Sequence, residues 1–275
     1  MAQSFDIGFV GAGQMGSALI RGLVRSGFCE GDRILAADPR QETLMPLIRE
    51  LGIQAAASTQ EVAHKTSTVI LAVKPQDVPP ALDELAKGLG PRHLLVSIAA
   101  GIPLGFLEAR LSPGVRLIRA MPNTPCLLSM GCSALAPGKH ATSEDMAKAR
   151  ALFQAVGEVV ELREELMDVA TGLNGSGPAY VFLFAEALVE AGVRMGIPWN
   201  SARKMVFQTL RGASEMLVIS SQHPAQLKEQ VCSPGGTTLA GLAVLERAGF
   251  RGLISQAVEQ ATQRARELGL ELERK

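Results

Sequence analysis

The chain has 275 residues, which is more than one small core needs and enough for two domains. Its 27 lysines and arginines balance its 27 aspartates and glutamates, so the charge does not favour a nucleic-acid or acidic-membrane partner. An apolar fraction of 47% is typical of globular proteins and argues against disorder. No stretch approaches the roughly 18 uncharged apolar residues of a membrane span, and we expect no signal peptide.

The four cysteines are Cys29, Cys126, Cys132 and Cys232. They form no CxxC pair, and no Cys/His cluster has the spacing of a zinc site. We therefore expect no metal, reduced packing cysteines and a cytoplasmic location.

Residues 1–163 alternate short apolar runs with helical patterns, which is typical of βαβ units. Strands this apolar are buried on both faces, so the pattern predicts a Rossmann-like, doubly wound, mainly parallel sheet. The predicted strands are Phe5–Val10, Arg33–Ala37, Thr68–Val73, Leu94–Ile98, Val115–Ala120, Cys132–Ala136 and Glu158–Leu162. The predicted helices begin near Gln14, Gln41, Thr59, Gln76 and Pro103, and one more spans Ser143–Val156.

Residues 164–275 lack strand signals and predict an all-α second domain. The predicted helices are Pro178–Met195, one capped by Asn200 or Ser201 that runs to Ile219, Thr238–Arg247 and Gly252–Leu268. The first of them carries one narrow polar stripe, made by Glu186, Glu190 and Arg194. Such a helix must be buried nearly all round, so we expect a homodimer in which the C-terminal helices of a partner subunit cover it.

A glycine-rich turn follows the first predicted strand and opens a helix. Its residues are Gly11, Ala12, Gly13, Gln14, Met15 and Gly16. In a GxGxxG fingerprint the first glycine allows the turn, the second admits a pyrophosphate and the third lets the helix pack on the strand. The free N–H groups of the helix N-terminus then bind the phosphates, so this turn predicts a dinucleotide site.

The end of the second predicted strand gives two conflicting indications of cofactor type. Asp38 favours NADH, because an acidic residue here bonds the ribose 2′-hydroxyl. Arg40 favours NADPH, because a guanidinium can bind the 2′-phosphate. A third interpretation is that Asp38 and Pro39 only open the next turn.

Three further motifs end predicted strands at one sheet edge, where ligands of open parallel sheets bind. They are Val73-Lys74-Pro75, the small residues from Ser97 to Gly101, and Met121–Pro125. Together they predict a lined groove, with space for a flat nicotinamide beside the small residues.

Two small-residue turns lie in the second domain. Gly172–Pro178 is either a tight packing elbow or a ligand contact. Val231–Thr238 contains Gly235 and Gly236, whose unpaired N–H groups suit a carboxylate. The alternative for the second turn is a flexible loop followed by a threonine that caps a helix.

These motifs together resemble the pyrroline-5-carboxylate reductase family over essentially the whole chain. The segments GAGQMG, VKPQ, SIAAGI, MPNTP, GLNGSGPAY and SPGGTT stand in that family's order and spacing. The resemblance implies reduction of L-1-pyrroline-5-carboxylate to L-proline with NADPH or NADH. It also implies assembly into a larger ring such as a decamer.

The same resemblance assigns roles to individual residues. Expected cofactor contacts are Gly11, Ala12, Gly13, Gln14, Met15, Gly16, Asp38, Arg40, Thr59, Ala72, Val73, Lys74, Pro75, Ile98, Ala99, Ala100 and Gln230. Expected substrate contacts are Glu164, Ser233, Gly235, Gly236, Thr237 and Thr238, with Thr238 bonding the ring nitrogen as the catalytic residue. Asp38 and Gln230 depart from relatives that have Ser and Asn there.

Two other functions fit parts of the pattern. A β-hydroxyacid dehydrogenase has the same layout but uses a helix-borne lysine as acid, and no lysine occurs between Lys148 and Lys204. A non-catalytic NAD(P)-binding protein is the second. Loss of NAD(P)H absorbance that depends on pyrroline-5-carboxylate would separate both from the reductase.

Overall fold

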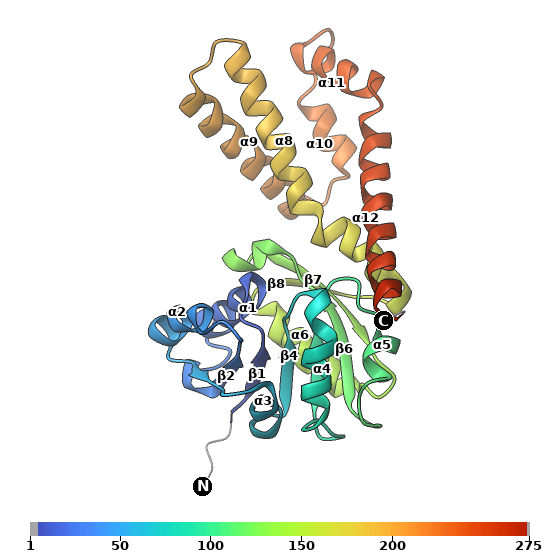
Figure 1. Cartoon of the computed structure of the whole chain (residues 1–275). Helices are drawn as coiled ribbons and strands as arrows, with labels where there is room; N and C mark the ends of the chain where they lie inside the picture. The colour runs from blue at the N-terminus through green and yellow to red at the C-terminus, as the bar shows by residue number, and fades with distance from the viewer. Residues whose placement is uncertain (1–4, 274–275) are drawn as a thin grey trace. The chain divides into compact units, whose positions relative to one another are not determined.

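The structure is a computed structural model that describes residues 5–273 (Figure 1). It consists of two compact units. The sheet unit comprises Met1–Ser176 and Val258–Lys275, and the helical unit comprises Gly177–Ala257. The second unit is therefore inserted into the sequence of the first.

The sheet unit contains one eight-stranded sheet with the order β3-β2-β1-β4-β5-β6-β7-β8. Its strands are β1 Ile7–Val10, β2 Ile34–Ala37, β3 Gln54–Ala55, β4 Thr68–Leu71, β5 Leu94–Ser97, β6 Arg116–Met121, β7 Gly131–Pro137 and β8 Gly157–Glu161. The first six in sequence are parallel; β7 runs antiparallel to β6, and β8 pairs parallel to β7. The strand order reverses between β1 and β4, which is where open α/β sheets bind ligands.

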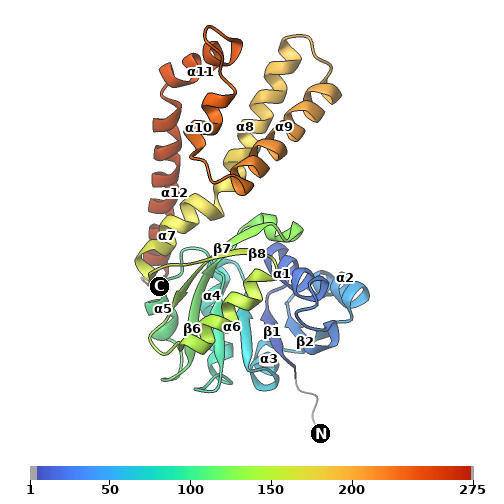
Figure 2. The same cartoon turned by 180° about the vertical axis from the view of Figure 1, so that it is seen from behind.

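Helices cover both faces of this sheet (Figures 1 and 2). Residues of α1 Gln14–Arg25, α2 Gln41–Leu51 and α6 Ser143–Gln154 share one apolar core with the sheet. Residues of α3 Thr59–Lys65, α4 Val78–Ala86 and α5 Leu104–Glu108 share the other. All residues of β1, β2, β4 and β5 are buried, because an apolar strand covered on both faces has no solvent side.

A helical elbow follows β8 within the sheet unit. It comprises a 3₁₀ turn at Glu164–Leu166, α7 Met167–Ala170 and a π-helical turn at Thr171–Gly175. Short 3₁₀ turns also occur at Gly31–Arg33, Pro75–Asp77 and Thr124–Leu128.

The helical unit contains α8 Gly177–Arg194, α9 Trp199–Ile219, α10 Pro224–Gln230, α11 Thr237–Arg247 and the first two turns of α12 Phe250–Glu273. The rest of α12 belongs to the sheet unit. Gly101 has φ +73°, and a Cβ on it would lie 2.7 Å from the carbonyl oxygen of Ala265. Leu272 joins the core beneath α5. The last helix thus packs directly against the strand-end loop at Gly101.

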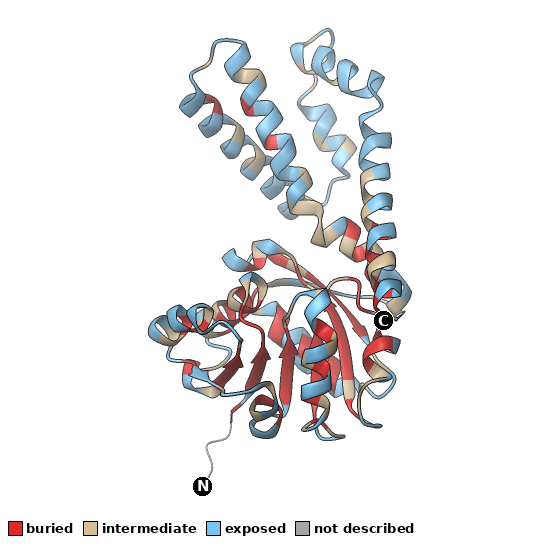
Figure 3. Cartoon of the chain, viewed as in Figure 1, coloured by how far each residue is buried: buried red, intermediate tan, exposed pale blue. Residues whose placement is uncertain are grey.

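Burial differs sharply between the two units (Figure 3). The sheet unit holds nearly all of the buried apolar residues, whereas α8 buries only Ala185 and Val189, and α9 only Ala202. The sequence predicts that α8 is covered nearly all round, and in the single chain that cover is missing. No helix among the described residues is long and apolar enough to cross a membrane.

Several element boundaries differ from the sequence predictions. Helix α9 begins at Trp199 with Pro198 at its N-cap, so neither Asn200 nor Ser201 caps it. Helix α10 and strand β3 were not predicted, and α12 is longer at both ends than Gly252–Leu268. The division into two domains at residue 164 stays a prediction. The two compact units of the structure instead divide after Ser176 and before Val258.

Candidate active site

The glycine-rich turn has three glycines in three different environments. Gly11 has φ +95°, and a Cβ there would lie 2.6 Å from the carbonyl oxygen of Ala72, so only glycine fits. A Cβ on Gly16 would lie 2.5 Å from the carbonyl oxygen of Gly11, which is how α1 packs closely against the turn. Gly13 is the N-cap of α1, and a Cβ there would meet no atom within 4 Å. The space over Gly13 is therefore free for a ligand.

A cavity of about 790 Å³ lies in front of this turn, along the carboxyl ends of the neighbouring strands. It is lined by Gly11, Gly13, Gln14, Met15, Asp38, Pro39, Arg40, Ala72, Val73, Lys74, Gln76, Asp77 and Ile98. Most of the cofactor residues predicted in the sheet unit are thus brought together around one space. Arg40 and Lys74 supply two cations to its wall, which suits phosphate groups.

A second cavity of about 510 Å³ shares Gly11, Asp38, Pro39, Val73 and Asp77 with the first. Its other lining residues are Val10, Ala37, Ala56, Ala57, Ser58, Thr59, Pro80, Ala81 and Glu84. Thr59 is the predicted cofactor residue that lies here. Ala56, Ala57 and Ser58 were missed, because β3, which precedes them, is only two residues long and gives no strand signal to mark its end.

Five predicted cofactor residues of the sheet unit do not line either cavity. They are Ala12, Gly16, Pro75, Ala99 and Ala100. Ala12 and Ala99 are buried, so their contribution is to the shape of the turn and of the strand end. Gln230 ends α10 in the helical unit, where its side chain donates to Oε1 of Gln222 over 2.7 Å.

Asp38 is engaged by the protein backbone. Its Oδ2 accepts a hydrogen bond of 2.8 Å from the N–H of Ala12, and its Oδ1 accepts one of 2.9 Å from the N–H of Arg40. The side chain is only 4% exposed, and the Nε of Arg40 lies 3.6 Å from Oδ1. The carboxylate therefore ties the end of β2 to the glycine-rich turn, while the more exposed Arg40 reaches the cavity.

Glu164 lies in a partly buried ionic network at the elbow. Its Oε1 accepts hydrogen bonds from the N–H of Leu104 over 3.0 Å and from Arg119 over 2.9 Å. Arg119 comes from β6, is 3% exposed and also pairs with Asp168 at 2.5 Å. The Oε2 of Glu164 is buried without a hydrogen-bond partner among the described residues, so one acceptor of this carboxylate is unused. The sequence reasoning missed Arg119, because an arginine in a buried strand shows no local signal of its partners.

The predicted carboxylate loop lies in the helical unit and leads into α11. Gly235 has φ +69°, and the N–H of Gly236 donates to the carbonyl oxygen of Ser233 over 2.9 Å. Gly236 is the N-cap of α11, and no side chain caps this helix. The first N–H groups of the helix therefore have no side-chain cap and can bind an anion.

Thr238 is half-buried in the first turn of α11, two positions after the N-cap. The interpretation that a threonine caps this helix is therefore wrong. Within residues 5–273 the hydroxyl of Thr238 makes no side-chain hydrogen bond.

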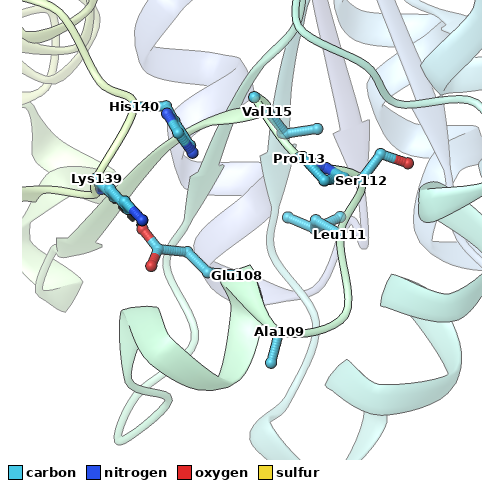
Figure 4. Close-up of a pocket in the computed structure, with 9 residues that line it drawn as sticks. Glu108, Ala109, Leu111, Ser112, Pro113, Val115, Lys139 and His140 are labelled. Carbon is cyan, nitrogen blue, oxygen red and sulfur yellow. Dashed lines mark hydrogen bonds between the residues drawn. The ribbon is translucent and has the colours of Figure 1, made fainter.

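A further cavity of about 290 Å³ lies where loops lead into β6 and out of β7 (Figure 4). Glu108, Lys139 and His140 are among its lining residues. Oε1 of Glu108 accepts a hydrogen bond of 2.7 Å from the backbone N–H of Lys139, so this carboxylate holds the turn after β7. The amino end of β6 is the edge opposite to the glycine-rich turn. The geometry therefore favours the groove at the carboxyl edge as the active site.

The cysteines are free, and three of them have perturbed thiols. Burial raises the pKa of Cys29 to about 11, and burial also raises the pKa of Cys126 and of Cys132. A protonated thiol is a poor nucleophile, so none of these three provides thiolate chemistry at neutral pH.

Comparison with known proteins decides the family. Residues 164–268 match the family model described as pyrroline-5-carboxylate reductase dimerisation. Pyrroline-5-carboxylate reductase 3 of Macaca fascicularis is 44% identical over 262 residues, which are 95% of each chain. The Methanosarcina acetivorans pyrroline-5-carboxylate reductase is 41% identical over 263 residues, 96% of this chain and 97% of the relative. This chain belongs to the pyrroline-5-carboxylate reductase family.

Solved structures of the pyrroline-5-carboxylate reductase family share the fold along the chain. The Plasmodium falciparum pyrroline carboxylate reductase with NADP bound gives a TM-score of 0.88 at 33% identity, covering 96% of this chain and 98% of that one. The Coxiella burnetii pyrroline-5-carboxylate reductase gives 0.89 at 32% identity, covering 97% and 99%. The sequence-based resemblance and the predicted fold class are thereby confirmed.

Two regions of this pyrroline-5-carboxylate reductase family member match separate family models. Residues 6–101 match the model described as NADP oxidoreductase, coenzyme F420-dependent, and they contain the glycine-rich turn and both cavities. Residues 164–268 match the dimerisation model, and the chain forms homo-oligomers.

Proposed function

We propose that this chain reduces L-1-pyrroline-5-carboxylate to L-proline with NADPH or NADH, as the last step of proline biosynthesis. The observation that carries the proposal is the 44% identity to a named reductase over 95% of both chains. The open glycine-rich turn and the cavity of about 790 Å³, to whose wall Arg40 and Lys74 contribute, support it physically.

The cofactor site fits a dinucleotide on three points. Gly13 leaves open space where a pyrophosphate would approach the backbone, and the N-terminus of α1 directs free N–H groups towards it. The second cavity, between the start of α3 and α4, provides an apolar slot for the adenine. Ile98, directly after β5, provides an apolar contact for the nicotinamide.

When bound, the reduced nicotinamide supplies a hydride, which adds to the carbon of the substrate C=N bond. The electron pair of that bond moves to nitrogen, which receives one proton and becomes the amine of proline. The residues of the chain bind the cofactor and the substrate and align them, since hydride transfer depends more on proximity than on a strong acid.

The substrate side is assigned to the loop from Ser233 to Thr238. The N–H groups in the first turn of α11, which no side chain caps, hold the carboxylate of the substrate, while the N–H of Gly236 is used by the carbonyl oxygen of Ser233. The hydroxyl of Thr238, which makes no side-chain hydrogen bond within residues 5–273, hydrogen-bonds the ring nitrogen and orients the imine. Glu164 is proposed as a further substrate contact; its Oε2 is buried and has no hydrogen-bond partner among the described residues.

The test of Thr238 compares two substitutions. Removing one hydrogen bond to a charged nitrogen costs about 1.5–3 kcal/mol, which is roughly 10- to 200-fold in kcat. Thr238→Ala is expected to fold, assemble and bind NAD(P)H normally, while its kcat falls by this factor. Thr238→Ser is expected to retain most activity. Steady-state oxidation of NADPH and of NADH with pyrroline-5-carboxylate, together with melting temperatures, measures these effects. A stable Thr238→Ala protein with wild-type kcat would end the assignment.

The assembly is proposed to be a homodimer through the C-terminal helices, built into a larger ring such as a decamer. The exposed apolar residues of α8 and α9 support the dimer, since patches of this kind mark association surfaces. Light scattering at micromolar concentration distinguishes a monomer, a dimer and a ring by mass.

Two remaining assignments are also proposals. We place the division of roles at residue 164, with 1–163 binding the cofactor and 164–275 binding substrate and dimerising.

We place the chain in the cytoplasm, which the four free cysteines support because a reducing compartment keeps thiols unpaired. Cell fractionation tests the location.

A further inference from the structure

Two asparagines that lie 51 positions apart in the sequence meet at the elbow. Nδ2 of Asn123, from the loop after β6, donates to Oδ1 of Asn174 over 2.8 Å. Nδ2 of Asn174 donates to the carbonyl oxygens of Cys132 over 2.8 Å and of Met121 over 3.2 Å. Oδ1 of Asn123 accepts from the N–H of Cys132 over 3.0 Å.

This pair uses all of its polar atoms within the protein. Both amide oxygens accept and both amide nitrogens donate, and only one orientation of each amide satisfies the backbone groups that it faces. Each amide group of the pair therefore already has a protein partner. This geometry supports the interpretation of the segment from Gly172 to Pro178 as a packing elbow.

The pair holds a π-helical turn, a rare form that is frequent at functional sites. The turn spans Thr171–Gly175 and is closed by a hydrogen bond of 2.9 Å from the N–H of Ser176 to the carbonyl oxygen of Thr171. A Cβ on Gly175 would lie 2.2 Å from Cε of Met121, so the turn sits directly on the end of β6.

The same turn also contacts the last helix. A Cβ on Gly172 would lie 2.5 Å from Oγ1 of Thr262 and 2.7 Å from the carbonyl oxygen of Val258. The chain enters the helical unit after Ser176 and leaves it before Val258. Both connections between the units therefore start at one place in the sheet unit, where the π-helical turn meets α12 at Val258 and Thr262; we call this place the joint. The two asparagines hold the joint against the end of β6 and the start of β7.

We propose that Asn123 and Asn174 are positioning residues for hydride transfer. The inference rests on the proposed function, in which the sheet unit binds the cofactor and the loop at Ser233–Thr238 binds the substrate. A displacement of about 1 Å between reacting atoms can cost about 100-fold in rate. The asparagine pair acts at a distance from the reacting atoms by fixing the joint through which both chain connections pass.

The test is a single-turnover measurement with saturating NAD(P)H and pyrroline-5-carboxylate. Asn174→Asp keeps the volume and the acceptor for Asn123 but replaces the two donated hydrogen bonds with repulsion from two carbonyl oxygens. The rate constant of hydride transfer is expected to fall about 10- to 100-fold, with a near-normal amplitude and unchanged NAD(P)H affinity. Rate and amplitude separate the roles, because a merely structural defect lowers the fraction of active enzyme and leaves the rate constant unchanged.

The pH profile gives a second measurement. A protonated carboxyl group can donate one hydrogen bond, so the rate of Asn174→Asp relative to wild type is expected to rise as the pH is lowered. Asn200→Ala is the matched control, because Asn200 is the third asparagine of the chain and its side chain is exposed. That variant should keep both the wild-type rate constant and amplitude.

If Asn174→Asp does not fold, Asn123→Ser provides the same test by removing the bridge between the two residues. Wild-type rate constants in the folded variants, or a loss confined to amplitude, would overturn the positioning role. An inactive wild-type chain, without substrate-dependent cofactor oxidation, would instead refute the proposed function on which this inference rests.

Discussion

The sheet unit and the helical unit distribute their apolar residues in opposite ways. In the sheet unit two large clusters of buried side chains fill the space between the strands and the helices on either face. In the helical unit Phe182 is 66% exposed and Val218 is 80% exposed, although both belong to regular helices. The first unit therefore carries its own core, whereas the helices of the second leave large apolar side chains exposed, as the proposed dimer requires.

The largest expected effect tests this contrast with one substitution placed in each unit. Met205 of α9 is 59% exposed and Met45 of α2 is 42% exposed. Met205→Glu is expected to abolish assembly, because it buries an unpaired charge in an apolar interface, and to abolish most activity with it. Met45→Glu should leave both unchanged. Light scattering and activity are the measurements, and an intact oligomer of Met205→Glu would place the interface elsewhere.

The second prediction compares two glycines of the same turn. Gly13→Val is expected to abolish NAD(P)H binding with little loss of melting temperature, since a Cβ there meets no protein atom but fills the space over the turn. Gly11→Ala is expected to destabilise the sheet unit by about 1–2 kcal/mol or more, because its φ is +95° and its Cβ meets the carbonyl of Ala72. Cofactor titration and thermal melting separate the two effects. Unchanged titration by Gly13→Val would refute the cofactor assignment.

The third prediction concerns cofactor preference. Asp38→Ser removes a negative charge beside the ribose site, so the ratio of kcat/KM for NADPH over NADH should rise. Arg40→Ala should lower that ratio by about tenfold, as expected from losing one charge-assisted hydrogen bond to a phosphate. Since Asp38 also holds the N–H of Ala12, Asp38→Ser should weaken binding of both cofactors. A ratio that stays constant in both variants would mean that neither side chain reads the 2′ position.

The smallest expected effect is the pH dependence of the sheet unit. Burial lowers the pKa of His93, whose Nδ1 accepts from the N–H of Gly90 over 2.8 Å, and Arg92 and Arg116 further disfavour its cation. The unfolded chain then binds more protons than the folded one below the ordinary histidine pKa near 6.5. Stability should therefore fall as the pH drops below that value, by at most about 1.4 kcal/mol per pH unit. His93→Gln should lessen this slope in urea unfolding at several pH values, and an unaltered slope would contradict the assignment.

The residues at the carboxyl edge of the sheet, which line the candidate active site, could be predicted from sequence because each apolar run is followed by its own motif. Asp38, Val73 and Ile98 all follow runs of this kind, and the parallel order then places them at one edge. The meeting of Asn123 and Asn174 could not be predicted, since it depends on how β7 turns back and where the elbow lies against it. Helix α10 was missed because the imidazole of His223, rather than a common capping residue, receives the N–H of Ala225.

The return of the last helix to the sheet unit has a consequence for synthesis on the ribosome. The contacts at Gly101 and beneath α5 require residues 258–272, which are translated only after the whole Gly177–Ala257 insertion. The strands can pair earlier, but one face of the sheet keeps a gap where Leu272 belongs. A chain whose translation stops within the insertion would therefore expose apolar surface near α5, which is the kind of feature that chaperones and proteases recognise.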